Sequence, residues 1–225
     1  MAAAAAPHPA GPTVTDIAET QGVYSLGVCV APDGGIIFSS YSPSHRISRL
    51  DPETREVITL AGDETGGFQD GPAATARFNT PNGVAVDGDG NVFVADQDNH
   101  RIRRIDAETR VVSTVAGDGT AGFQDGPGAT ARFHNPSGVA VDGDGNVFVA
   151  DQSNHRIRRI DAETRVVSTV AGDGSYGFQD GPAATAKFHN PNGVAVDGDG
   201  NVFVADQGNH RIRRIDAETR VVSTV

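Results

Sequence analysis

The sequence predicts an all-β protein made of four tandem repeats, and two observations support this. Histidines recur every 55 residues and phenylalanines keep the same spacing, at His45, His100, His155 and His210 and at Phe68, Phe123 and Phe178. Within a repeat, short runs alternate between apolar and polar residues, which is the period of a half-buried strand. A fixed repeat of this kind predicts a tandem array of one supersecondary unit.

Each repeat is predicted to contain four strands. Residues 83–87 (GVAVD) and 92–96 (VFVAD) flank the turn DGDGN, which indicates a hairpin. Residues 100–106 (HRIRRID) form a third strand, whose isoleucines three positions apart predict a bulge or a splayed outer strand. After the turn AETR, residues 111–117 (VVSTVAG) form the fourth strand. In the long loop that follows, Asp125 is placed to cap a short helical turn near Pro127.

Tandem four-stranded antiparallel sheets are the signature of β-propeller blades. We expect a disordered Ala/Pro tail over residues 1–12, a lead-in strand over 13–26, a divergent blade over 27–80, and further blades over 81–135, 136–190 and 191–225. The last repeat stops at Val225, so we expect an open or incomplete ring from a fragment, a truncated product or a designed array. Two exposed sheet faces would then favour either a homo-oligomer that closes the ring or further missing blades.

The segment PNGVAVDGDGNVFVADQDNHRIRRID at residues 81–106 resembles the NHL repeat. The shared pattern is a Pro-x-Gly start, a Gly-Asn turn, an aliphatic-Ala-Asp strand and an Asn-His-Arg-Ile segment. The resemblance is strong over residues 81–225 and weak over 27–80. It implies propeller blades, usually five or six in the family, and no single activity.

Composition restricts the class of partner. The formal net charge is −11 over 225 residues, which disfavours nucleic acid and anionic membranes. A single cysteine, Cys29, cannot form an internal disulfide, and the N-terminus lacks the basic region of a signal peptide. We therefore expect a cytoplasmic protein that binds neither nucleic acid nor membrane.

Two repeated motifs could bind metal, and both are interpreted as structural. DGDGN lacks the later carboxylates of a calcium loop, so we interpret it as a turn. His100, His155 and His210 could form a three-histidine ring, but each begins the third strand, away from the inner first strand. We expect each histidine to link the second and third strands, with Asp96 or its equivalents as partner. The sequence predicts no metal ligand, no cofactor and no catalytic residue.

The third strand of each repeat is rich in arginine. Arg101, Arg103 and Arg104 could indicate RNA binding, but Asp96 and Asp106 lie close in the sequence. We therefore expect a solvated ladder of salt bridges.

The few differences between repeats predict where partners bind. Residues 81–135 and 136–190 differ at six positions, namely 82/137, 98/153, 120/175, 121/176, 128/183 and 132/187. All lie in the link after the second strand, in the long loop, or at the start of the first strand, which we place on one face of the propeller. The predicted partner-binding residues are Asp98, Thr120, Ala121, Phe123, His134, Ser153, Ser175, Tyr176, Phe178, His189 and Gly208.

The favoured function is a non-enzymatic NHL-type scaffold that binds protein partners through this long-loop face, with Phe123, Tyr176 and Phe178 as apolar anchors. One alternative is a hydrolase or lyase like the gluconolactonases and strictosidine synthases, acting at the propeller axis. Another is a structural or engineered repeat array with no ligand.

Overall fold

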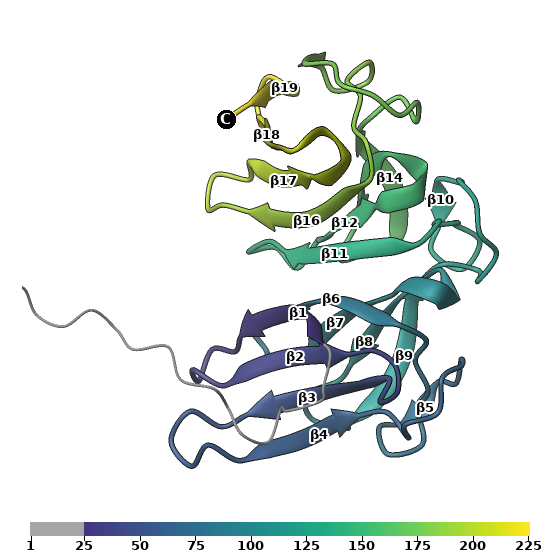
Figure 1. The fold of residues 1–225 in the computed structure, drawn as a ribbon, viewed down its shortest axis with the longest axis vertical. Helices are drawn as coiled ribbons and strands as arrows, with labels where there is room; N and C mark the ends of the chain where they lie inside the picture. The colour runs from purple at the N-terminus through teal and green to yellow at the C-terminus, as the bar shows by residue number, and fades with distance from the viewer. Residues whose placement is uncertain (1–24) are drawn as a thin grey trace, which may run out of the picture.

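The computed structural model describes residues 25–225, which form four antiparallel sheets arranged as an arc (Figure 1). The first sheet contains β1 (Ser25–Val30), β2 (Ile36–Ser40), β3 (Arg46–Leu50) and β4 (Val57–Ala61). The second contains β6 (Pro81–Val86), β7 (Val92–Asp96), β8 (Arg101–Ile105) and β9 (Val111–Ala116). The third contains β11 (Pro136–Val141), β12 (Val147–Asp151), β13 (Arg156–Ile160) and β14 (Val166–Ala171). The fourth contains β16 (Pro191–Val196), β17 (Val202–Asp206), β18 (Arg211–Ile215) and β19 (Val221–Thr224).

The second, third and fourth sheets each gain a fifth, two-residue strand from the loop that precedes them. These are β5 (Gly71–Pro72), β10 (Gly126–Pro127) and β15 (Gly181–Pro182), which pair with β9, β14 and β19. Each long loop therefore pairs with the outermost strand of the sheet that follows it. As a result, each of these sheets includes two residues that the sequence assigned to the preceding repeat.

The sheets pack face to face through alternating side chains of each strand. Ala85 of β6 and Phe93 of β7 pack on Val139, Val147 and the rest of the third sheet, and the same pattern recurs at the other two junctions. The inner strands β1, β6, β11 and β16 lie closest together (Figure 1). The predicted four-bladed, all-β propeller fold is thus confirmed.

Glycine allows the inner strands to approach one another closely. A Cβ atom on Gly83 would lie 2.8 Å from the Cα of Gly138, and one on Gly27 would lie 2.8 Å from the Cα of Gly83. No real side chain fits at that distance, so a glycine at this position is required wherever another blade follows.

The outward faces of the two end sheets are exposed. In β1, Val28 and Val30 are 66% and 65% exposed, whereas the corresponding Val84 of β6 is 5% exposed. In β18, Ile212 is 50% exposed, whereas Ile102 of β8 is fully buried. The described sheets therefore form an open arc with one apolar face uncovered at each end.

The predicted local features have mixed outcomes. The prediction that DGDGN forms a turn is confirmed. The Asp87 carboxylate stabilises the turn by accepting hydrogen bonds from the backbone N–H groups of Asp89 and Asn91. The bulge in the third strand is confirmed by a register shift between Ile102 and Arg103. The expected tail over 1–12 and the lead-in strand up to residue 24 lie outside the described residues. No helix in the described part of the chain is long and apolar enough to cross a bilayer.

Candidate functional site

The link after the second strand and the start of the first strand lie together on one face. The link is a short 3-10 turn in the three later sheets, at Gln97–Asn99, Gln152–Asn154 and Gln207–Asn209. Its middle residue donates a backbone hydrogen bond to the residue two positions before the inner strand, as from Ser153 to the His134 carbonyl at 3.0 Å. The prediction that these segments share a face is confirmed.

Each link ends at a histidine that connects neighbouring blades. His100 and His155 have a φ of 54°, in the left-handed region. The Nδ1 atom of His100 accepts the backbone N–H of Asn135 at 3.2 Å, and that of His155 accepts the N–H of Asn190 at 3.2 Å. The expected bond from histidine to Asp96 is therefore wrong, because the imidazole points toward the following blade.

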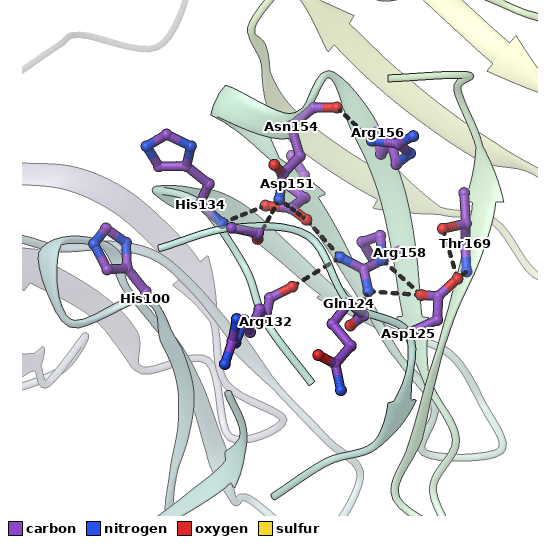
Figure 2. Close-up of polar contacts among 12 residues, drawn as sticks. His100, Gln124, Asp125, Arg132, His134, Asp151, Asn154, Arg156, Arg158 and Thr169 are labelled. Carbon is purple, nitrogen blue, oxygen red and sulfur yellow. Dashed lines mark hydrogen bonds and ion pairs between the residues drawn. The ribbon is translucent and has the colours of Figure 1, made fainter. Parts of the chain in front are cut away.

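Beneath this face, each of the three later blades contains a buried ion pair. In the third blade, Asp151 Oδ2 accepts bonds from Arg158 Nη1 at 2.6 Å and from Asn154 Nδ2 at 2.8 Å (Figure 2). Its other oxygen, Oδ1, accepts the backbone N–H of His134 at 2.8 Å. Both Asp151 and Arg158 are fully buried, so the expected solvated ladder is wrong for the middle arginine of each strand.

The same arginine fixes the long loop. Arg158 donates from Nε and Nη2 to Asp125 Oδ1, and from its two terminal nitrogens to the carbonyls of Arg132 and Gln124 (Figure 2). The second oxygen of Asp125 accepts bonds from Thr169. Asp125 therefore does not cap a helical turn, as its position suggested, but joins the loop to the third and fourth strands.

Burial dominates the electrostatics of these carboxylates. It raises the pKa of Asp96 to about 6, although the Arg103 guanidinium acts in the opposite direction. Burial raises the pKa of Asp151 as well, again opposed by its arginine partner. Three hydrogen bonds still satisfy each carboxylate.

The phenylalanines predicted as apolar anchors are partly covered by arginine. The Arg156 guanidinium carbon lies 3.8 Å from the centroid of the Phe123 ring, and that of Arg211 lies 4.0 Å from the centroid of Phe178. The two rings remain 44% and 45% exposed. Each guanidinium is held over a ring as in a cation–π contact, which helps to order the loop. The anchor role of these two residues stays a prediction.

Histidines and one tyrosine line the surface above the junctions between blades. His100 and His134 have ring centroids 5.8 Å apart, and His155 and His189 have centroids 6.0 Å apart. At the second of these junctions, Tyr176 lies 5.7 Å from His189 and is 72% exposed. Burial, followed by the neighbouring histidine, lowers the pKa of His100 and of His155.

The other predicted binding residues lie near these rings or along the same loop. Asp98 accepts a bond from the Thr80 hydroxyl at 2.6 Å, and Gly208 donates its N–H to the His189 carbonyl at 2.7 Å. Thr120 and Ala121 occupy the loop positions that Ser175 and Tyr176 occupy one repeat later, and all four are exposed. The structure thus brings Tyr176, His189 and the link Gln207–Asn209 together. We call this surface, with the equivalent residues of the other blades, the long-loop face.

One of the six differences between repeats lies elsewhere. A Cβ on Gly128 would meet the carbonyl of Arg165 at 2.9 Å, beside the turn between the third and fourth strands of the next blade. The long loop therefore runs from the long-loop face to the opposite face. Ser137 is also buried, where its hydroxyl contacts the backbone of the fourth sheet. The expectation that all six changes share one face is therefore wrong for position 128/183, whereas Ser137 lies at the start of the inner strand but is not exposed on that face.

Within residues 25–225, no three histidine, cysteine or acidic side chains are placed to hold a metal ion. The inner ends of the links carry amides instead. Gln97 Nε2 donates to Gln152 Oε1 of the next blade at 3.4 Å, and Asn82 donates to Gln97 at 3.3 Å. This row of neutral amides can form hydrogen bonds but offers no general acid or base.

Comparison with known proteins identifies the repeats. The NHL repeat family matches residues 78–105, 133–160 and 188–215. The chain carries three NHL repeats. Each match begins just before an inner strand and ends with the arginine-rich third strand, so one NHL repeat includes the buried aspartate, the linking histidine and the paired arginine.

Two proteins that this chain resembles in sequence are much longer. The chain is 33% identical over 201 residues to "Protein SUPPRESSOR OF QUENCHING 1, chloroplastic" of Arabidopsis thaliana, covering 84% of this chain and 19% of that protein. It is 38% identical over 161 residues to NHL repeat-containing protein 2 of Bos taurus, covering 66% of this chain and 22% of that protein. The chain thus spans about a fifth of the length of these relatives.

Solved propellers support the fold. An auxiliary nutrient binding protein from Bacteroides thetaiotaomicron superposes with a TM-score of 0.67 at 23% identity, covering 88% of this chain and 47% of that one. At this identity the likeness concerns the fold alone.

Proposed function

We propose that this NHL-repeat propeller is a non-enzymatic scaffold that binds protein partners through its long-loop face. The observation that carries the proposal is the position of Tyr176. Its ring is 72% exposed and is held beside His155 and His189, although its apolar area would be more stable out of water. Tyrosine is one of the three residue types that are enriched among the hot spots of protein interfaces.

The distribution of differences between repeats supports the same surface. Position 121 is alanine where position 176 is tyrosine, and the middle of the link is Asp98, Ser153 or Gly208. None of these side chains contacts the buried arginines, although a Cβ on Gly208 would meet the ring and carbonyl of His189 at 2.5–2.7 Å. The other positions can therefore vary without disturbing the buried ion pairs. The side chains on this face therefore differ from blade to blade, while the strands that carry them stay the same. A surface that recognises a partner needs such differences.

The alternative, a hydrolase or lyase acting at the propeller axis, is less favoured by the residues present. The inner ends of the links carry Gln97, Gln152 and Asn82, whose amides neither donate nor accept a proton in general acid–base catalysis. A binding role needs only hydrogen bonds and apolar contact, which this face supplies.

Peptide selection tests the proposal. Phage-displayed random peptides would be selected on the immobilised chain, and the dissociation constant of each selected peptide measured with variants. We expect Tyr176→Ala to weaken binding by about 30-fold, as for a hot-spot tyrosine. The matched control is Val166→Ala, which shortens a 41% exposed apolar side chain beside the opposite turn. No enriched peptide, or equal sensitivity to both variants, would contradict the proposal.

A further inference from the structure

The fourth sheet presents a face that the second and third sheets bury. Residues 202–206 and 211–215 repeat the sequence of 92–96 and 101–105 without change. Ile102 and Ile157 are fully buried under the next blade, whereas Ile212 is 50% exposed. The exposed surface therefore has the side chains of an inter-blade interface, and no blade within residues 25–225 covers it.

A hydrogen-bond acceptor on this face is also unmatched. His45, His100 and His155 each accept a backbone N–H from the start of the following inner strand, at 3.2 Å in all three cases. His210 occupies the same position in the fourth sheet, is exposed, and has no such donor among residues 25–225. The histidine-to-backbone bond that forms at three junctions therefore has no fourth counterpart among residues 25–225.

The inner strand of the fourth sheet is shaped for close approach. A Cβ on Gly138 would lie 2.9 Å from the backbone nitrogen of Val194 and 3.0 Å from the Cα of Gly193. A Cβ on Gly193 would meet only the Ala205 methyl group at 3.5 Å, which is an ordinary contact. Glycine at 193 is therefore not needed by the described fold, but another inner strand packed there would need it.

The complementary half of this interface lies at the other end of the same chain. In the first two internal junctions, the covering blade contributes Val84 or Val139, each at most 6% exposed, and in the third it contributes Val194, which is partly buried. The first sheet presents Val28 at the same position, with Leu26 and Val30 beside it, and these side chains are 47–66% exposed. Contiguous exposed apolar faces on soluble proteins mark association surfaces.

We propose that the exposed face of the fourth sheet binds the exposed face of the first sheet in a second copy of this chain. The contact continues the interface that the chain already forms three times internally. It is heterologous, because it joins two different surfaces, so the copies form a ring if the rotation closes and a filament if it does not. This proposal concerns the ends of the arc and is independent of binding at the long-loop face.

Two single substitutions block the two halves separately. Gly193→Ala adds a methyl group that a docked inner strand could not accommodate, and we expect it to raise the dissociation constant of self-association about tenfold or more. The matched control is Gly198→Ala, because a Cβ there meets nothing within 4 Å. Val28→Lys places a charge on the opposite half of the interface. Urea unfolding would show that each variant keeps the stability of a folded monomer.

Light scattering over a concentration series, alone and in mixtures, decides the outcome. We expect wild type and Gly198→Ala to associate, Gly193→Ala and Val28→Lys to be monomeric at the same concentrations, and their equimolar mixture to form a 1:1 dimer through the one intact pair of faces. A wild type that stays monomeric, because residues 1–24 or an unrelated partner cover the faces, would overturn the proposal. So would variants that associate like wild type, or a mixture that stays monomeric.

Discussion

Removing the charge of Asp151 tests the claim that the buried ion pair holds each blade together. Asp151→Asn keeps the shape of the side chain but leaves the Arg158 guanidinium, which is fully buried, without its buried counter-ion. Breaking such a pair from one side costs about 3–5 kcal/mol. Arg158 would keep Asp125 and two backbone carbonyls, so we expect the lower value, about 3 kcal/mol.

Urea unfolding followed by far-UV circular dichroism at pH 7.5 would measure this loss. A loss of this size corresponds to a fall in Tm of about 6–12 °C for a domain of this length. Asp144→Asn is the control, since Asp144 is exposed in a turn. The double variant Asp151→Asn/Arg158→Met should lose less than the sum of the single variants. If Asp151→Asn lowers stability by under about 1 kcal/mol, like a surface change, the pair does not hold the blade and the reasoning fails.

Two further predictions concern the junctions between blades. Gly138→Ala should destabilise the chain by about 1–3 kcal/mol, because the added methyl meets the backbone of β16, whereas Gly143→Ala, with open space around it, should not; urea midpoints compare the two. Because burial lowers the pKa of His100 and His155, their contribution to stability should be complete above about pH 6.5 and be lost as the pH falls below it. The double variant His100→Gln/His155→Gln should flatten this part of the pH profile, and an unchanged slope would show that these imidazoles are not the titrating groups.

The strands were predictable from sequence because their period is local, whereas the role of each arginine was not. The spacing of RIRRI indicated the bulge but not that Arg103 turns inward to Asp96, since burial depends on the loop that closes over it. A signal was nevertheless present: Asp70 recurs with the same 55-residue spacing as Arg103 and is its second partner. The linking histidines left no comparable signal, because their partner is a backbone N–H, which any residue except proline supplies.

The buried network also explains how these repeats can be nearly identical yet offer different surfaces. Arg158 joins four segments, because it contacts Asp151 of the second strand, Asp125 and a carbonyl of the loop, and the backbone just before the inner strand. Replacing Asp151 would remove the buried counter-ion of Arg158, so these two residues can change only together. Ser153 and Tyr176 form no bond with Arg158 or its carboxylate partners, so substitution there leaves the buried ion pair intact. At positions 98/153 and 121/176, which lie outside this network, the repeats therefore differ while the buried ion pair stays constant.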